Sequence, residues 1–276
     1  SPAAAETAGN AAAKRRGTAA EVAMTIEHTI HGNGPEGVIV CHGWFGDWTV
    51  FEPIVPIIDR SAFTYAFMDQ RGYGKSRGQT GRYTVAEIAA DAIGLADALG
   101  WRRFHLVGHS MGGKAVQRIA IDARDRVKSV VAVTPVPASG VPFDEKAWGL
   151  FSGAPDDDKL RAAIVDFSVS GRLTPVWVER IVRASRETTT VDSFRAYLND
   201  WAKGDFSAEA KGLATPFKVM VGEHDVALSA DFMRQTFLAW YPNAELEVIG
   251  NSGHYPMQET PVAFVTAVER FLGAHA

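Results

Sequence analysis

Short apolar runs alternate with helical patterns along most of this chain. The runs VIV (38–40), VVAV (130–133) and VMV (219–221) are too short for helices and are hydrophobic at successive positions. A strand that is apolar on both faces is typical of a parallel sheet with helices packed on each side. The alternation therefore predicts an α/β fold with a mainly parallel sheet of about eight strands, flanked by helices.

The individual elements are placed by their hydrophobic period and by their boundary residues. Thr84 and Glu87 form a predicted capping box at the start of one helix, and Thr260 followed by Pro261 is a predicted start for the last helix. We expect strands at 22–30, 37–43, 63–69, 103–110, 128–136, 216–225 and 244–252, and helices at 84–100, 112–123, 229–241 and 260–272.

The alternation stops between Pro137 and Leu213. This stretch carries successive amphipathic helical patterns at 156–169, 175–185 and 190–203. A helical insert over one edge of the sheet would explain the pattern, and three ordinary crossover helices are the alternative. We therefore expect three parts, which are an N-terminal extension (1–21), a core (22–136 with 214–276) and a helical insert that forms a cap (137–213).

The composition argues against several classes of protein. A net charge of −4, with no basic block beyond Lys14-Arg15-Arg16, argues against a nucleic-acid surface. No apolar run approaches the length of a membrane span, and the single cysteine, Cys41, excludes an internal disulfide bond. The extension lacks the apolar region of an intact signal peptide. We expect a cytoplasmic protein; a cleaved export signal is the alternative.

One serine lies between two glycines at the predicted junction of a strand and a helix. The stretch is Gly108-His109-Ser110-Met111-Gly112, and it follows the apolar run FHLV. A tight turn at this point needs flanking residues without colliding side chains, which glycine supplies. The turn holds the serine hydroxyl beyond the strand end, beside the N-terminus of a helix where developing negative charge is stabilised. Ser110 is therefore the candidate nucleophile.

These residues resemble the α/β-hydrolase superfamily, and GHSMGGKA is most similar to its small serine carboxylesterases with a helical cap. The resemblance covers the chain from about Val22 to its end. It implies a catalytic acid and then a histidine after Ser110 in the chain, each at a strand end. Asp225 and His254 fit those places, and Glu223 is the alternative acid. The remaining histidines are expected to be structural or solvated.

The same resemblance implies an oxyanion hole made by two backbone N–H groups. Met111, directly after the nucleophile, would give one, and Trp44 in the stretch His42-Gly43-Trp44-Phe45-Gly46 would give the other. Phe45 is the alternative to Trp44 as donor. We expect the side chains of Trp44 and Phe45 to line the substrate pocket.

The sequence thus predicts a serine hydrolase that cleaves a small-molecule carboxylic ester or a related carbonyl compound, with no cofactor and no metal. Gly32, Gly34 and Gly37 have the spacing of a dinucleotide motif, but Pro35 lies among them and a strand follows, so a turn is predicted instead. A lactonase, a carbon–carbon bond hydrolase and a perhydrolase would share the same catalytic residues. Dehalogenases and epoxide hydrolases of this fold use an aspartate nucleophile, which Ser110 disfavours. Outside catalysis, the alternative is a ligand receptor.

Overall fold

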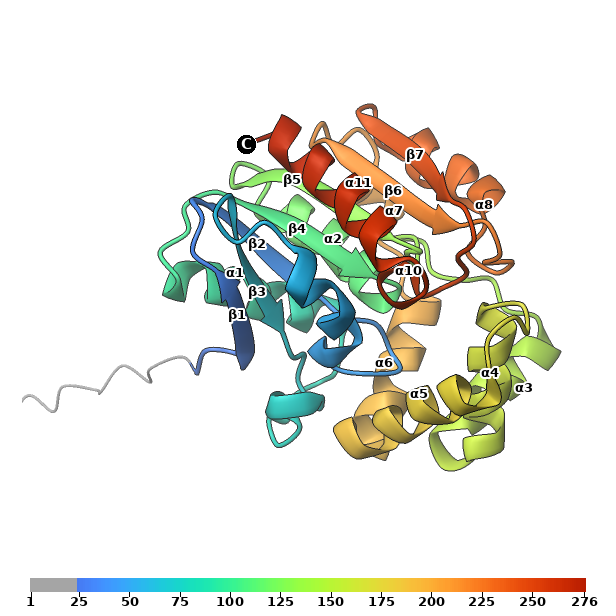
Figure 1. Ribbon diagram of the computed structural model, residues 1–276. Helices are drawn as coiled ribbons and strands as arrows, with labels where there is room; N and C mark the ends of the chain where they lie inside the picture. The colour runs from blue at the N-terminus through green and yellow to red at the C-terminus, as the bar shows by residue number, and fades with distance from the viewer. Residues whose placement is uncertain (1–23) are drawn as a thin grey trace, which may run out of the picture.

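A single seven-stranded sheet organises the described part of the chain. The computed structural model describes residues 24–276, and the predicted extension at 1–21 lies outside them. The strand order is β1-β3-β2-β4-β5-β6-β7, with β1 antiparallel to β3 and every other neighbouring pair parallel (Figure 1). The strands are β1 (His28–Gly32), β2 (Glu36–Cys41), β3 (Phe63–Met68), β4 (Phe104–His109), β5 (Val127–Val133), β6 (Phe217–Gly222) and β7 (Ala244–Ile249).

The predicted strands lie within three residues of these bounds except at the first, and those predicted at 128–136, 216–225 and 244–252 end three residues too late. The first strand was expected at 22–30, whereas β1 begins at His28 and runs on to Gly32. Its partner explains the shift, because His28 to Gly32 pair residue by residue with β3. The predicted count of about eight strands is one more than the seven that the described residues form.

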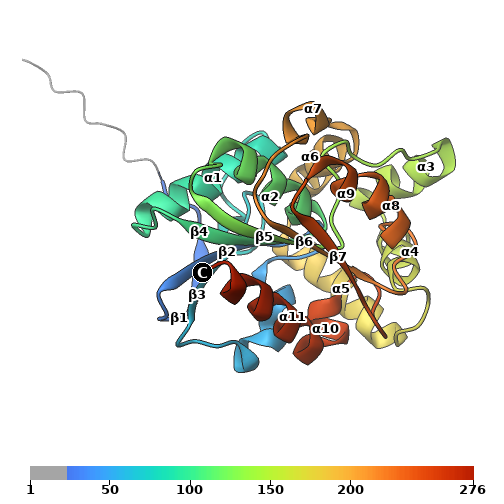
Figure 2. The same ribbon diagram turned by 90° about the horizontal axis from the view of Figure 1, so that it is seen from above.

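Helices cover both faces of the sheet. Figure 2 shows α1 (Val85–Ala98) and α2 (Met111–Asp122) on one side and α11 (Pro261–Ala274) on the other. Beside α11 lie α10 (Pro256–Glu259) and the 3-10 helix η1 (Trp48–Ile57). Both faces of β4 and β6 are consequently buried, as the fully apolar runs predict.

At two predicted helix starts, the observed hydrogen bonds differ from the predicted ones. Thr84 accepts the N–H of Glu87 as a capping box requires, but the Glu87 carboxylate accepts the N–H groups of Arg82 and Tyr83 instead of that of Thr84. Thr260 does occupy the N-cap position of α11, yet its hydroxyl donates to the Pro256 carbonyl and caps nothing. The turn of α10 directly before it supplies that nearer acceptor.

The helix predicted at 229–241 is divided in two. It consists of α8 (Ala230–Gln235) and α9 (Phe237–Trp240), which meet at Thr236 with φ −115° and ψ −86°. The Thr236 hydroxyl donates to the Phe232 carbonyl, so a local side-chain bond competes with the helical pattern at the break.

Between β5 and β6 the chain forms a succession of helices. They are α3 (Glu145–Gly153), η3 (Ala154–Asp156), α4 (Asp158–Ser168), α5 (Pro175–Thr188), α6 (Val191–Lys203) and α7 (Ser207–Ala210). Residues 137–213, which we call the insert, contain no strand. Figure 1 shows α3 to α6 gathered beyond the arrowheads of the central strands. Within residues 24–276, no helix is both long enough and apolar enough to cross a bilayer.

Candidate active site

Ser110 lies in a strained turn between β4 and α2. Its backbone has φ 56° and ψ −112°, a conformation that residues other than glycine seldom adopt. Close backbone contacts require the neighbouring glycines, since a Cβ on Gly108 would lie 2.2 Å from the Gly112 carbonyl oxygen. A Cβ on Gly112 would lie 2.3 Å from the carbonyl oxygen of Cys41, at the end of β2. The predicted reason for these two glycines is thus observed.

Three predicted side chains form one chain of hydrogen bonds. The Ser110 Oγ lies 3.0 Å from His254 Nε2, and His254 Nδ1 lies 2.6 Å from Asp225 Oδ2. The Asp225 side chain is 1% exposed, and its other oxygen accepts the Leu228 N–H at 3.0 Å. Because a carboxylate oxygen can only accept, Nδ1 of His254 carries the proton and Nε2 faces Ser110 as an acceptor.

Glu223, the alternative acid, makes different contacts. Its carboxylate accepts the N–H of Asn251 at 2.6 Å and lies 3.5 Å from the ring of His224. The side chain is 47% exposed and makes no hydrogen bond to His254 among the described residues. Of the two acids, the structure therefore places Asp225 against the histidine.

The loop after β2 lies beside Ser110. A Cβ on Gly43 would lie 3.3 Å from the Ser110 Cβ, so the absence of a side chain at Gly43 allows the close approach. Inside the loop, His42 Nδ1 donates to the Gly43 carbonyl at 2.8 Å, and Nε2 accepts the Gln70 N–H at 3.1 Å. Burial lowers the pKa of His42 to about 4, against the opposing effects of the Gly43 carbonyl and the Asp47 carboxylate. His42 is therefore a neutral, structural residue, as expected.

His109 is also structural. Its Nε2 donates to the backbone carbonyl of His254 at 2.6 Å, and the two rings lie 4.9 Å apart. Burial, reinforced by the nearby His254, holds the pKa of His109 well below its ordinary value. A neutral His109 thus stabilises the His254 loop through this hydrogen bond.

A cavity of about 150 Å³ opens at Ser110. Core residues, the loop after β2 and the insert all contribute to its walls, and most of these side chains are apolar. Trp44 and Phe45, the two predicted pocket residues, both line it. From the insert come Val141, Phe143, Phe151, Ile164, Val165, Phe167, Ser168, Arg180, Ile181, Ala184 and Trp201. Among the residues described, no three or more His, Cys, Asp or Glu side chains gather in a way that could hold a metal ion.

The family model described as alpha/beta hydrolase fold matches residues 37–179, more than half of the chain. The chain belongs to the alpha/beta hydrolase family. The hydrolase is 30% identical over 219 residues to 2-hydroxymuconate semialdehyde hydrolase of Pseudomonas putida, covering 74% of this chain and 75% of that one. It is 26% identical over 274 residues to a 2-hydroxy-6-oxononadienedioate/2-hydroxy-6-oxononatrienedioate hydrolase of a Pseudomonas species, covering 92% and 94%.

A solved structure has the same architecture. The esterase of Exiguobacterium antarcticum superposes on the hydrolase with a TM-score of 0.81, over 90% of this chain and 95% of that one. The sequences are 17% identical, so this likeness concerns the fold.

Sequence reasoning missed the contacts that bind Trp44 to the insert. The Trp44 ring stacks on Phe194 of α6 with centroids 3.9 Å apart and 7° between the planes, and its Nε1 donates to the Phe194 carbonyl at 2.7 Å. On the Phe194 ring lies the guanidinium of Arg161, 3.9 Å from the centroid, and Arg161 is 1% exposed. The three residues of this stack lie 33 to 150 positions apart in the chain, so no local pattern could reveal it.

Proposed function

We propose that this hydrolase cleaves carboxylic esters through an acyl-enzyme intermediate, with Ser110 as nucleophile, His254 as base and Asp225 as the acid that orients the base. The observation that carries the proposal is the continuous hydrogen-bond chain from Asp225 to Ser110, which ends at the apolar cavity. A serine hydroxyl is a weak nucleophile until a base accepts its proton, and a neutral imidazole held by a carboxylate is such a base.

The reaction follows from this arrangement. Ser110 Oγ attacks the ester carbonyl while its proton moves to His254 Nε2, and Asp225 stabilises the imidazolium that forms. The tetrahedral intermediate expels the alcohol, which takes the proton from His254. Water then attacks the acyl-enzyme in the same way, releasing the acid and restoring Ser110.

Two backbone N–H groups would stabilise the oxyanion of each tetrahedral intermediate. Met111 is the first residue of α2, so its N–H has no partner within the helix. Trp44 lies in the loop that Gly43 brings against Ser110. We assign the two donors to Met111 and Trp44, with Phe45 as the alternative to Trp44. Each such donor contributes about 3 kcal/mol to catalysis in enzymes of this kind.

The cavity favours a small apolar substrate. A volume of about 150 Å³ accommodates little more than one aromatic ring. In this proposal, residues 22–136 and 214–276 perform the chemistry, while the insert (137–213) acts as a cap and selects the substrate. A short acyl or aryl ester is the class that fits.

Carbon–carbon bond hydrolysis is the second candidate. The 2-hydroxy-6-oxo dioates in the name of the Pseudomonas relative contain ketone and carboxylate groups but no ester, so their hydrolysis breaks a carbon–carbon bond. Arg180 of α5 is exposed and is the one Lys or Arg among the lining residues of this cavity, which suits a carboxylate on the substrate. Glu52, opposite in charge, lies at the same cavity and counts against this candidate.

One experiment tests the chemistry. A fluorophosphonate should label wild-type protein once, at Ser110, and p-nitrophenyl acetate should release p-nitrophenol in a burst. The same panel contains a lactone, longer esters and a vinylogous diketone acid. Turnover of the diketone acid alone would favour carbon–carbon cleavage. Labelling at another serine would exclude the proposed nucleophile, and the absence of turnover on every substrate would favour a ligand receptor.

A second experiment tests the role of the insert. Phe151→Ala should enlarge the cavity and change the ratio of kcat/KM for a long ester to that for a short ester by about tenfold, which equals about 1.4 kcal/mol. Trp148→Ala is the matched control, because Trp148 packs on Lys203 and does not line the cavity. An unchanged ratio in folded Phe151→Ala and Trp201→Ala proteins would place specificity in the core loops.

A further inference from the structure

The loop that carries His254 is held at the two residues on either side of it. Glu259, at the end of α10, accepts the N–H of Gly253 at 2.9 and 3.0 Å and the N–H of Tyr255 at 2.9 Å. Its carboxylate therefore binds the peptide groups directly before and after the histidine. The Glu259 side chain is only 2% exposed, so these bonds form largely without competition from water.

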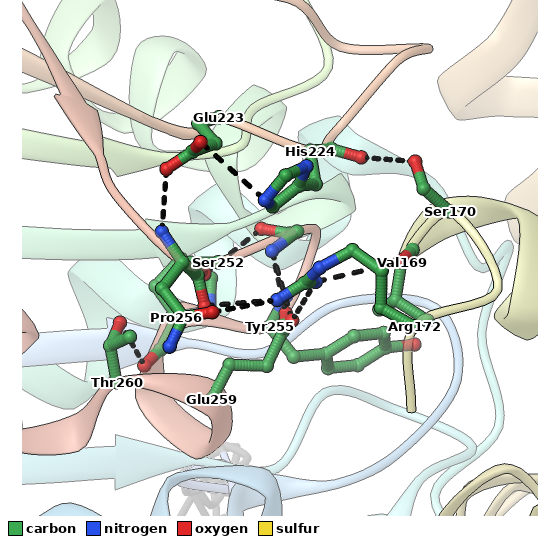
Figure 3. Close-up of polar contacts among 12 residues, drawn as sticks. Val169, Ser170, Arg172, Glu223, His224, Ser252, Tyr255, Pro256, Glu259 and Thr260 are labelled. Carbon is green, nitrogen blue, oxygen red and sulfur yellow. Dashed lines mark hydrogen bonds and ion pairs between the residues drawn. The ribbon is translucent and has the colours of Figure 1, made fainter. Parts of the chain in front are cut away.

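Arg172, from the turn between α4 and α5, completes this contact from the insert. Its guanidinium bonds to Glu259 Oε1 at 2.9 Å and to the backbone carbonyl of Asn251 at 3.1 Å. Figure 3 shows the side chain lying between the turn and the His254 loop. Arg172 compensates the buried charge of Glu259 and binds a further residue of the same loop. The insert is thereby joined to the support of the histidine.

The same turn bonds to the backbone of two loops, the one that carries His254 and the one that carries Asp225. The Ser168 carbonyl accepts the N–H of His254 at 3.2 Å. Two residues on, the Ser170 hydroxyl donates to the carbonyl of His224 at 2.7 Å, beside Asp225 (Figure 3). Ser170 has φ 57°, a strained conformation that persists only where surrounding contacts determine it. The turn therefore contacts the loops of the acid and of the histidine together.

We propose that Glu259 and Arg172 are positioning residues for His254, and that through them the turn at residues 168–172 keeps His254 aligned between Asp225 and Ser110. Neither residue touches the reacting atoms. This inference rests on the proposed serine-hydrolase function, in which His254 is the base.

The distances at His254 explain why such support matters. The ring must satisfy Asp225 at 2.6 Å and Ser110 at 3.0 Å at the same time, through opposite nitrogens. A shift of the backbone by a fraction of an ångström weakens one bond or the other. Misplacement by about 1 Å costs about 100-fold in rate.

Two substitutions test the proposal. Glu259→Gln keeps the shape but places an amide N–H2 against one of three donors, so we expect kcat to fall by about 30-fold with KM changed less than about threefold. Arg172→Lys keeps the charge but loses the planar fork, so we expect a fall of about fivefold. Asp91→Asn is the matched control, because it weakens another arginine–carboxylate pair, that of Asp91 with Arg71, which makes no bond to the His254 loop; its kcat should equal that of wild type.

A spectroscopic measurement separates positioning from simple loss of stability. The proton between His254 Nδ1 and Asp225 should give a strongly low-field proton resonance in wild type and in Asp91→Asn. In Glu259→Gln and Arg172→Lys it should shift or broaden at a temperature where both proteins are folded. If Glu259→Gln does not fold, Arg172→Lys decides the question.

The outcomes are distinct. Variants that lose only stability, with wild-type kcat and an unchanged resonance, overturn the positioning role. A fall in kcat that Asp91→Asn shares has the same consequence. If a fluorophosphonate fails to label Ser110 in wild-type protein, the proposed function is wrong. If wild-type protein is labelled and both variants keep wild-type kcat, only the positioning role is wrong.

Discussion

Residues 24–276 contain two serine–histidine–acid arrays, which have similar contact distances but different surroundings. In the first, Ser110, His254 and Asp225 lie at the carboxyl ends of strands and border a cavity. In the second, Ser129 Oγ lies 2.7 Å from His105 Nδ1, and His105 Nε2 lies 2.9 Å from Glu36 Oε2. The contact distances alone would not tell a chemist which array is reactive.

Access and backbone geometry make the difference. Ser129 and His105 are fully buried near the amino ends of β5 and β4, outside the cavity that Ser110 lines. Ser129 lies inside β5, where the pairing with β4 shifts register, whereas Ser110 occupies a turn with positive φ that leads into a helix N-terminus. Glu36 also pairs with Lys128 at 2.8 Å, so its carboxylate binds β5 as well as the histidine. A triad therefore needs an open serine and nearby free N–H groups in addition to its hydrogen bonds.

Replacing each serine with alanine should separate the arrays most strongly. Ser110→Ala should lower kcat by about 10⁵ to 10⁶ while leaving the fold intact. Ser129→Ala should keep kcat within about twofold. Because it leaves His105 Nδ1 without a partner, it should lower the free energy of unfolding by about 1 to 3 kcal/mol. Ester turnover and urea unfolding measure both; comparable losses of activity would contradict the assignment.

Replacing the acid of each array should give a smaller difference in kcat than replacing the serines. Asp225→Asn should lower kcat by about 10⁴, because the amide favours the wrong tautomer of His254. Glu36→Gln should leave kcat unchanged and reduce the free energy of unfolding by about 1 kcal/mol through its weaker bond to Lys128. Glu223→Gln serves as a second control near the site, since Glu223 bonds to Asn251 instead of His254. A loss in Glu223→Gln as large as that in Asp225→Asn would exchange the two roles.

The smallest expected effect concerns the stability of the folded protein in acid, to which His105 of the buried Ser129–His105–Glu36 array contributes. Burial lowers the pKa of His105, and the opposing carboxylate of Glu36 does not reverse the shift. The folded protein thus favours neutral His105, while in the unfolded chain histidine gains its proton near pH 6.5. Stability from this group is present above about pH 6.5 and is lost as the pH falls toward the folded-state pKa.

His105→Gln provides the measurement. The variant cannot gain that proton, so its unfolding free energy should decline less than that of wild type between about pH 7 and about pH 5. The comparison is made as a difference between the two proteins, because other groups, such as Asp69 with its raised pKa, contribute equally to both. An equal decline in the two proteins would show that His105 does not titrate in this range.

Local sequence signals predicted the sheet and the turn of Ser110, and the resemblance to α/β hydrolases, applied to the predicted strand ends, indicated Asp225 and His254. The apolar runs, the glycine pair and the strand ends are local signals, so the sequence alone shows them. The sequence could not distinguish the roles of His105 and His42, since burial and partners are set by tertiary packing. Nor could it reveal that Arg172 meets Glu259, or that Phe194 meets Trp44, because residues far apart in the chain make these contacts. The break at Thr236 escaped prediction since the surrounding apolar period continues across it.

The positive φ of Ser110 has a consequence for how sequences like this one change over time. A residue with a side chain in such a conformation costs about 1 to 3 kcal/mol, whereas glycine tolerates it. Selection for thermal robustness alone would thus favour Ser110→Gly, which sacrifices turnover. A serine at this strained backbone position is a trade-off between activity and stability, and we expect libraries screened only for heat resistance to lose the nucleophile at this residue.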